Sequence, residues 1–300
     1  MTRRPDFLVV GAPKCGTTTL YSYFKQSPHV YVPRKELHYF GADLDFALPT
    51  PTREEYEREF EPAGDRISWD VDVWYLYSRT AAREIRAYVP DVRIIISVRN
   101  PVDFMYSMHS QAVYSQDETE PSFRAALELE ETRRRGRSVP NRAYVRHATF
   151  YRDLACFSEQ VERYRAVFPP EQLHLMLLDD LAADAEAAWA GVSAFLGIPP
   201  VGVTRFRAVN ANKGLHVPGL ARAEAFLRRV VVPRLGLDRF PEPLKSIGKR
   251  TLRRIERLNT YHEPRPPLDP ELRASLMAEF EPEICALEEI LGRDLGHWRS

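Results

Sequence analysis

Residues 7–19 read Phe-Leu-Val-Val-Gly-Ala-Pro-Lys-Cys-Gly-Thr-Thr-Thr, and this stretch decides the fold. Its apolar beginning, residues 7–10, predicts a buried strand that ends at Gly11. After Thr17, large apolar side chains recur at helical spacing, so a helix follows the turn. A loop between a buried strand and the N-terminus of a helix can hold an anion, because the free backbone N–H groups there point at it.

The loop departs from the usual sequence pattern of loops that bind nucleoside triphosphates. Gly11 and Gly16 have the G-x4-G spacing of that pattern. Thr17 stands where the pattern has its lysine, and the lysine lies inside the loop, at Lys14. Because the Thr18 hydroxyl could still bind a magnesium ion, the loop alone does not exclude a kinase. A lysine at position 14 would nevertheless approach the anion from a different direction.

The rest of the chain repeats the alternation of strand and helix. Residues 93–98 form the clearest strand, and residues 102–113 can form a helix after it. Residues 173–178 predict another strand, followed by an alanine-rich helix from about residue 183 to 196 that stops at Gly197. This order predicts an α/β fold, with a central parallel sheet of about five strands flanked by helices and with C-terminal helical additions.

The sequence has no internal repeat and no low-complexity linker, so we expect a single domain over residues 1–300. Residues 6–205 would form the α/β core, and residues 206–300 would form the C-terminal additions. Residues 117–147 are polar and interrupted by loop-forming residues. We expect this stretch either to cover the site as a lid or to be a solvated helical insertion.

The net charge of the whole chain is zero, but the charged residues are distributed unevenly along the sequence. The sequence holds 42 Lys+Arg and 42 Asp+Glu, which argues against a protein that coats nucleic acid. Residues 36–65 carry nine acids and two bases, a net charge of −7, and residues 219–265 carry twelve bases and five acids, a net charge of +7. The basic segment is either a solvated helical surface or a surface that attracts an anionic acceptor or a membrane.

Other features of the sequence exclude further classes of protein. No stretch approaches the ~20 apolar residues of a membrane span, and the apolar run near the N-terminus is too short for a signal peptide. Three cysteines, Cys15, Cys156 and Cys285, are too few and too scattered for a disulfide framework or a zinc site. These observations predict a protein of the reducing cytoplasm.

Two more segments carry groups that suit a phosphate. Arg99 follows the clearest strand at its carboxyl end, where ligands bind in open α/β sheets, and its guanidinium donates in a fork that fits phosphate oxygens. Ser107, on the next predicted helix, could add a hydroxyl. Later in the chain, residues 210–218 contain the turn Lys213-Gly214.

Together with the segment Lys35-Glu-Leu-His-Tyr-Phe40, these segments resemble the sulfotransferases that use 3′-phosphoadenosine 5′-phosphosulfate (PAPS). The likeness is greatest to the branch of the heparan sulfate sulfotransferase domains and their soluble bacterial relatives. Residues 13–19 are similar to that family's 5′-phosphosulfate loop, residues 98–107 to its 3′-phosphate motif, and residues 35–40 to its acceptor-side motif. Residues 210–218 resemble its late loop that closes over the cofactor. The likeness spans residues 6–298.

The resemblance implies in-line transfer of a sulfonyl group from PAPS to an acceptor hydroxyl, with release of 3′-phosphoadenosine 5′-phosphate (PAP) and without a metal. Lys14 would pair with the oxygen that bridges phosphate and sulfonate, and Glu36 would be the general base. If this segment is extended, His38 shares a face with Glu36, so His38 is the other candidate base. The residues implied to bind the cofactor are Lys14, Cys15, Gly16, Thr17, Thr18, Thr19, Arg99, Ser107, Lys213 and Gly214.

The sequence departs from these relatives on the acceptor side. Asp70, Asp72 and Trp74 occupy a strand end that is often built from small residues or contains lysine in relatives, and we expect all three near the acceptor. Met108 stands where some relatives place a tryptophan that stacks on adenine. The acceptor therefore stays open between a sugar and a natural-product alcohol or phenol.

Two other functions stay open on the sequence alone. One is a P-loop kinase that uses Mg·ATP, and the other is a catalytically silent nucleotide-binding module. The resemblance favours a small-molecule or glycan acceptor, no nucleic acid and no transmembrane segment, as in a cytoplasmic bacterial enzyme. The sequence gives no sign of the oligomeric state.

Overall fold

The structure of the chain is a computed structural model, and it describes residues 3–46, 49–140, 145–205, 213–217, 219–220, 254 and 258–299. Most of the predicted basic segment, residues 219–265, lies outside the described residues, as do residues 206–212. The chain divides into two compact units. The first comprises residues 1–108, 144–210 and 268–300, and the second comprises residues 109–143 and 211–267.

The first unit is built on a five-stranded sheet in which every pairing is parallel. The strands run in the order β2-β3-β1-β4-β5. Their bounds are β1 Phe7–Gly11, β2 Val30–Tyr31, β3 Ile67–Val71, β4 Arg93–Val98 and β5 Leu173–Leu177. The predicted α/β fold with a parallel sheet of five strands is confirmed.

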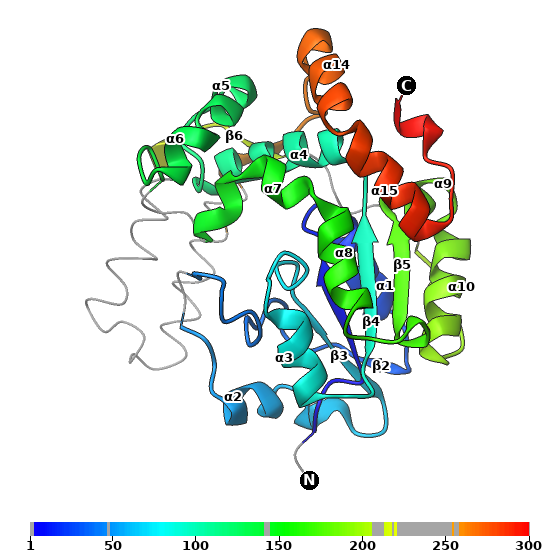
Figure 1. Cartoon of the computed structure of the whole chain (residues 1–300). Coiled ribbons are helices and arrows are strands. Elements are labelled where there is room, and N and C mark those ends of the chain that lie inside the picture. Colours follow the sequence, from blue (N-terminus) through cyan, green and yellow to red (C-terminus); the bar gives the residue numbers. More distant parts are fainter. Residues whose placement is uncertain are drawn as a thin grey trace, which may run out of the picture. The chain divides into compact units, whose positions relative to one another are not determined.

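Helices cover both faces of this sheet, which explains why β1 and β4 are almost continuously apolar. On one face, α1 (Thr17–Phe24) and α10 (Ala185–Leu196) pack an aromatic cluster against the strands. The ring of Phe24 lies 4.5 Å from that of Trp69 and 5.2 Å from that of Trp189. Figure 1 shows α3 (Ala81–Tyr88) and α8 (Phe157–Arg165) in front of the sheet, on the other face.

The helix predicted over residues 183–196 is confirmed as α10, and a further helix that was not predicted precedes it. Helix α9 (Leu178–Ala183) follows β5 directly, and α10 begins after Asp184. The Asp184 carboxylate accepts hydrogen bonds from the N–H groups of Glu186 and Ala187, so it caps a new helix instead of continuing the first. Gly197 ends α10 in the left-handed conformation, as predicted.

Shorter and later helices complete the first unit. These are α2 (Arg53–Arg58), η1 (Glu61–Ala63), η2 (Arg146–Thr149), α7 (Tyr151–Ala155), η3 (Pro170–Gln172), α14 (Pro270–Glu279), α15 (Glu281–Leu291) and η6 (Gly296–Arg299). Helix α4 spans Pro101–Ser115. The C-terminal helices are tied to the segment after β4, because Asn100 Nδ2 donates to the Trp298 carbonyl at 3.0 Å and Arg273 pairs with Asp103 at 2.8 Å.

The second unit contains α5 (Phe123–Glu128), α6 (Glu130–Arg134) and a two-stranded antiparallel sheet of β6 (Lys213–Leu215) and β7 (Thr260–His262). Arg133 and Glu118 form a fully buried ion pair here, with N–O distances of 2.7 and 2.8 Å. Because the Arg133 side chain is enclosed, replacing it would disturb the packing of this unit. The lid over residues 117–147 stays a prediction, and Arg133 is not a suitable residue to test it.

Two buried carboxylates stand at the end of β3. Asp70 Oδ2 accepts hydrogen bonds from the hydroxyls of Tyr56 at 2.9 Å and Tyr75 at 3.1 Å. Burial and, to a smaller extent, the charge of Asp72 raise the pKa of Asp70 to about 7, against the pull of these hydroxyls. Asp70 is therefore a structural carboxyl whose ionisation opposes folding.

We expect Asp70→Asn to become more stable relative to the wild type as the pH rises. The pKa of Asp70 is raised in the folded state, so its contribution to stability is complete below about pH 4 and is lost as the pH rises to about 7. Asparagine keeps an oxygen for the tyrosine hydroxyls and does not ionise. Urea unfolding at pH 5 and pH 8 measures the difference, with the exposed Asp65→Asn as control. A stability difference that is the same at both pH values would contradict this assignment.

Candidate active site

The carboxyl ends of the five parallel strands meet at one edge of the sheet, where open α/β folds bind ligands. The segments that follow β1, β3 and β4 carry the residues singled out from the sequence: the loop after Gly11, Asp72, and Arg99. The segment Lys35–Phe40 joins them there, because the Glu36 N–H donates to the carbonyl of Val71, the last residue of β3, at 2.8 Å.

The two glycines of the loop after β1 are required by packing and backbone conformation. Gly11 has φ 143°, and a Cβ there would lie 2.7 Å from the Val73 carbonyl oxygen. Gly16 has φ 85°, and its Cβ would lie 2.8 Å from a methyl of Leu181 in α9. Their spacing therefore follows from the close approach of the segments after β3 and β5.

Hydrogen bonds from the end of β4 hold the loop after β1 in place. Ser97 Oγ donates to the Cys15 carbonyl at 2.6 Å, and the Ala12 N–H donates to the Ser97 carbonyl at 2.7 Å. Arg99 Nη1 donates to the carbonyl of Lys14 at 3.3 Å. The structure therefore brings together Lys14 and Arg99, which are 85 positions apart in the sequence.

The loop has the features of an anion site. Gly16 caps α1 without a side chain, and the first turn of α1 contains no acidic residue, so its N–H groups face the loop without a competing carboxylate. Arg99 Nε is buried and has no hydrogen-bond partner among the residues that the structure describes. A buried guanidinium N–H without a partner is satisfied by a bound anion. Among the hydroxyls, Thr17 and Thr19 are buried and Thr18 is half-buried.

Cys15 contributes to this loop through its backbone. The side chain is fully buried, and burial raises the pKa of the Cys15 thiol to about 12, despite the nearby charges of Arg99 and Lys14. The thiol is therefore neither a nucleophile nor a metal ligand at neutral pH. All three cysteines are free, in agreement with the prediction that they form no disulfide framework.

The acceptor-side segment is held through its backbone. The His38 N–H donates to Asp72 Oδ2 at 3.0 Å, and the N–H groups of Tyr39 and Phe40 both point at the Tyr75 hydroxyl, at 3.0 and 3.4 Å. Tyr75 in turn donates to the buried Asp70. The carboxylates after and within β3 thus shape this segment, instead of contacting an acceptor themselves.

The extended conformation under which Glu36 and His38 would share a face is not the observed one. Glu36 has φ 58° and His38 has φ 54°, both in the left-handed region. The two side chains nevertheless line the same cavity, although His38 is only 6% exposed. His38 Nδ1 lies 2.6 Å from Asp72 Oδ2, so Asp72 contacts both the backbone and the ring of His38.

The charges around Glu36 suit a proton acceptor. Burial and then the charge of Asp72 raise the pKa of Glu36, while Lys35 and His38 act against this shift. Burial alone would lower the pKa of His38, but the hydrogen bond and charge of Asp72, with the charge of Glu36, outweigh burial and raise it. A carboxylate whose pKa is raised is a stronger base than an ordinary carboxylate, so the surroundings of Glu36 favour uptake of a proton.

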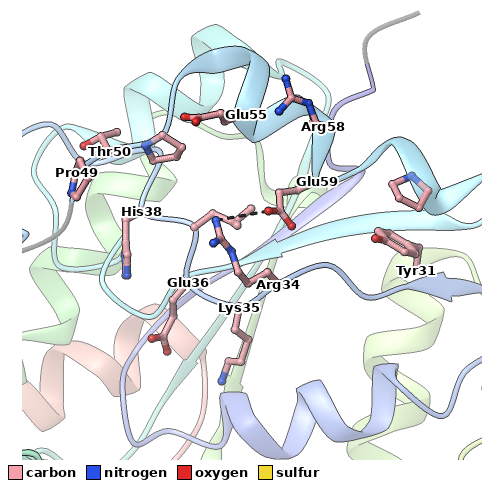
Figure 2. Close-up of a pocket in the computed structure, with 13 residues that line it drawn as sticks. Tyr31, Arg34, Lys35, Glu36, His38, Pro49, Thr50, Glu55, Arg58 and Glu59 are labelled. Atoms are coloured by element: carbon pink, nitrogen blue, oxygen red, sulfur yellow. Dashed lines mark ion pairs between the residues drawn. The ribbon is translucent and has the colours of Figure 1, made fainter. Parts of the chain in front are cut away.

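The cavity beside Glu36 has a volume of about 1010 Å³. Residues of the acceptor-side segment line one part of it, and α2 with its flanking residues lines another, including Thr50, Glu55 and Arg58. In Figure 2, Lys35 and Glu36 extend away from α2, whereas Arg34 turns back toward Glu59, with which it pairs at 3.5 Å. The wall is therefore polar and carries both signs of charge.

Lys35 is a residue of this site whose contact the sequence motifs do not predict. Its Nζ donates to Thr18 Oγ1 at 3.2 Å, so it joins the acceptor-side segment to the first turn of α1. The sequence does offer a signal, a lysine directly before the candidate base Glu36. The contact itself could not be predicted, because it depends on how the residues before Glu36 pack against α1, 17 positions earlier in the sequence.

The described contacts do not test the cofactor role of the remaining predicted residues. Ser107 is buried in α4. Lys213 and Gly214 lie in β6 of the second unit, so their cofactor role stays a prediction. The expectation that Asp70, Asp72 and Trp74 lie near the acceptor stays a prediction. Asp70 and Asp72 are fully buried and do not line the cavity, although Asp72 contacts His38, which does.

Comparisons with known proteins agree with this geometry. A family profile described as "Sulfotransferase domain" matches residues 6–215, so the chain belongs to the sulfotransferase family, whose donor is PAPS. This confirms the resemblance inferred from the motifs. A solved structure titled "Crystal Structure of Sulfotransferase from Alicyclobacillus acidocaldarius" is 26% identical and covers 99% of this chain, with a TM-score of 0.71; this chain matches 100% of that structure.

Two human proteins are among the similar sequences. Heparan sulfate glucosamine 3-O-sulfotransferase 6 of Homo sapiens is 27% identical over 226 residues, which is 74% of this chain and 60% of the relative. Bifunctional heparan sulfate N-deacetylase/N-sulfotransferase 3 of Homo sapiens is 26% identical over 223 residues, which is 66% of this chain and 23% of the relative. The match thus spans less than two thirds of each curated relative.

The described residues form neither a membrane-spanning helix nor a cluster of metal ligands. None of the helices that the structure describes has both the length and the apolar character needed to cross a membrane. No group of three or more His, Cys, Asp or Glu side chains in the described ranges has the arrangement of a metal site.

Proposed function

We propose that the protein transfers a sulfonyl group from PAPS to an acceptor hydroxyl, with Glu36 as the general base. One observation carries this proposal. The anion-binding loop after β1 and the cavity beside Glu36 are directly adjacent, because Lys35 lines the cavity and also contacts Thr18 on the first turn of α1. An anionic donor and a hydroxyl acceptor would therefore meet at this point.

The donor would be held by the loop after β1 and the residues after β4. The backbone N–H groups of residues 15–19, with the hydroxyls of Thr17 and Thr18, suit the 5′-phosphate. Arg99, with its buried Nε, suits the 3′-phosphate that distinguishes PAPS from ATP. Ser107 and the turn Lys213-Gly214 are proposed to complete the 3′-phosphate site on the strength of the motif resemblance.

In the proposed step, PAPS supplies an activated sulfonyl group. The acceptor oxygen forms a bond to sulfur while the bond between sulfur and the bridging oxygen breaks. The electron pair of that bond stays on the bridging oxygen, which becomes part of the PAP phosphate. Lys14 would stabilise the charge that develops there, and Glu36 takes the proton of the acceptor hydroxyl. His38, held by Asp72, would keep a positive charge beside the Glu36 carboxylate.

The kinase alternative is disfavoured by the partner of Thr18. In a P-loop kinase, the equivalent hydroxyl binds magnesium. Here Thr18 Oγ1 accepts a hydrogen bond from the Lys35 ammonium, and a cation at this position repels a second cation. The silent-module alternative would leave the pKa shift of Glu36 and the adjacent cavity without a role.

The acceptor is proposed to be a hydroxyl compound with several polar groups, such as a sugar or a polar natural-product alcohol. The cavity wall supports this, since it combines carboxylates, arginines and a threonine with few aromatic surfaces. A flat phenol would normally bind between aromatic or apolar walls.

PAP binding tests the donor half of this proposal. We expect 3′-phosphoadenosine 5′-phosphate to raise the Tm without magnesium, and Mg·ATP to raise it less. Incubation of a metabolite extract with protein and PAPS, followed by mass spectrometry, should then reveal an acceptor that gains the mass of a sulfonate. Stabilisation by Mg·ATP alone would favour the kinase, and PAP binding without any sulfonated product would favour the silent module.

A further inference from the structure

We propose that Lys35 is a catalytic residue, which binds the oxygens of the sulfonyl group as that group passes from the donor loop to the acceptor. This inference rests on the proposed function and adds a second cation to the reaction centre. Lys14 belongs to the donor loop, whereas Lys35 comes from the acceptor-side segment. Lys14 would therefore contact the transferred group from the donor side, and Lys35 would contact it from the acceptor side.

Two contacts of Lys35, and one contact of the ring beneath it, fix the position of this side chain. Its Nζ donates to Thr18 Oγ1 at 3.2 Å and lies 5.4 Å from the centre of the Tyr21 ring. The Tyr21 hydroxyl donates to the Pro33 carbonyl at 3.4 Å, so the ring that supports the ammonium is itself bound to the segment that leads to Lys35. Figure 2 shows the Lys35 side chain extended away from α2.

The surroundings of Lys35 favour an ammonium group that can exchange one hydrogen-bond acceptor for another. Burial lowers the pKa of Lys35, while the charges of Glu36 and Asp72 act against this and favour the ammonium. Thr18 is a neutral acceptor, so its hydrogen bond is weaker than one to an anionic oxygen. When a donor occupies the loop, the ammonium can turn from the Thr18 hydroxyl to a sulfonyl oxygen within reach of the same turn of α1.

The chemistry requires a positive charge at this point. The sulfonyl oxygens carry negative charge throughout the transfer, while the acceptor oxygen gains charge as it loses its proton to Glu36. An ammonium beside both groups reduces their repulsion, and its electrostatic effect is large because the site is half-buried. Lys35 neither gains nor loses a proton in this step; the proton of the acceptor still passes to Glu36.

Lys25 provides a matched control. Its Nζ lies 4.9 Å from the centre of the same Tyr21 ring, but it stands at the C-terminal end of α1, one residue past Phe24, far along the chain from the loop. Lys35→Met and Lys25→Met each remove one ammonium from this ring. Only the first removes a cation that contacts the first turn of α1.

We expect Lys35→Met to lower kcat about 10²-fold, and Lys25→Met to leave it within about twofold. The rates are measured with the acceptor from the extract and also as the slow hydrolysis of PAPS to PAP, which needs no acceptor. Calorimetry should show that Lys35→Met binds PAPS about tenfold more weakly but binds PAP, which lacks the sulfonyl group, as the wild type does. Equal loss of affinity for both nucleotides, or a kcat like that of Lys25→Met, would overturn the proposal.

The Lys35→Arg variant distinguishes a role of Lys35 as a fixed positive charge from a role in proton transfer. Arginine keeps the cation but does not deprotonate, so we expect it to retain most of the activity that Lys35→Met loses. An arginine variant as inactive as the methionine variant would show that Lys35 acts as a base, contrary to the proposal. If the wild type itself neither binds PAP nor transfers a sulfonyl group, the proposed function fails; if the wild type transfers and Lys35→Met does too, only this inference fails.

Discussion

Lys14→Ala is expected to lower kcat about 10³-fold while the protein stays folded. The Lys14 backbone has φ 62°, and its carbonyl accepts a hydrogen bond from Arg99 Nη1. Alanine keeps that carbonyl and tolerates the left-handed backbone no worse than lysine does, so the shape of the loop should survive. What is lost is the ammonium that would stabilise charge on the bridging oxygen as the bond to sulfur breaks.

Single-turnover measurements with PAPS, together with the Tm and the affinity for PAP, test this expectation. Because the charge on the bridging oxygen persists in the product, Lys14→Ala should also bind PAP more weakly than the wild type, whereas its affinity for PAPS should change less. Lys25→Ala, at the other end of α1, serves as the control for removing a lysine from this region. Full activity of Lys14→Ala would refute the mechanism, and an unfolded variant would be replaced by Lys14→Met.

Glu36→Gln is expected to cost about 10³-fold in kcat and to remove the acid limb of the pH profile. The base must be ionised to act, so wild-type activity should fall as the pH drops through the pKa of Glu36, which burial and Asp72 raise above its usual value. Glutamine has the same shape and accepts no proton in this range. The remaining activity of the variant should therefore not depend on pH over that interval.

His38→Gln distinguishes the two candidate bases. We expect it to lose less activity than Glu36→Gln and to keep the acid limb, since His38 acts through its position beside Glu36 and is bound to Asp72 at 2.6 Å. The reverse order of losses, with the acid limb absent only in His38→Gln, would make His38 the base and Glu36 the residue that orients it. Profiles of kcat against pH for both variants, at saturating PAPS, decide between these outcomes.

The sequence predicts the donor side well because that side is local. A strand, two glycines and a helix start lie within residues 7–19, and Arg99 directly follows its own strand. Both glycines do stand where a side chain would collide, and Arg99 does reach the loop. Continuous apolar runs such as β4 likewise predict the parallel sheet, since only a strand covered on both faces has that composition.

The acceptor side is less predictable because its conformation depends on distant partners. Glu36 and His38 adopt left-handed backbones that their residue types do not favour, and contacts with β3 and the residue after it impose them. The same carboxylate, Asp72, looks from the sequence like an acceptor contact, and only its burial and its bond to His38 reveal a structural role. The hydrogen bond between Lys35 and Thr18 likewise joins two segments that lie 17 positions apart in the sequence.

The backbone attachment of residues 36–40 has a consequence for how such enzymes diverge. Strand β3 and the residues just after it hold this segment by its N–H groups, which every residue except proline offers. The facing wall of the cavity, by contrast, is made of side chains from α2 and its flanks. Under the proposed function, mutations in that wall can therefore alter which compound is accepted without displacing Glu36, the proposed base. The contacts that position the proposed base are separate from the side chains that form the facing wall. Evolution can therefore change the acceptor while the reaction centre stays the same.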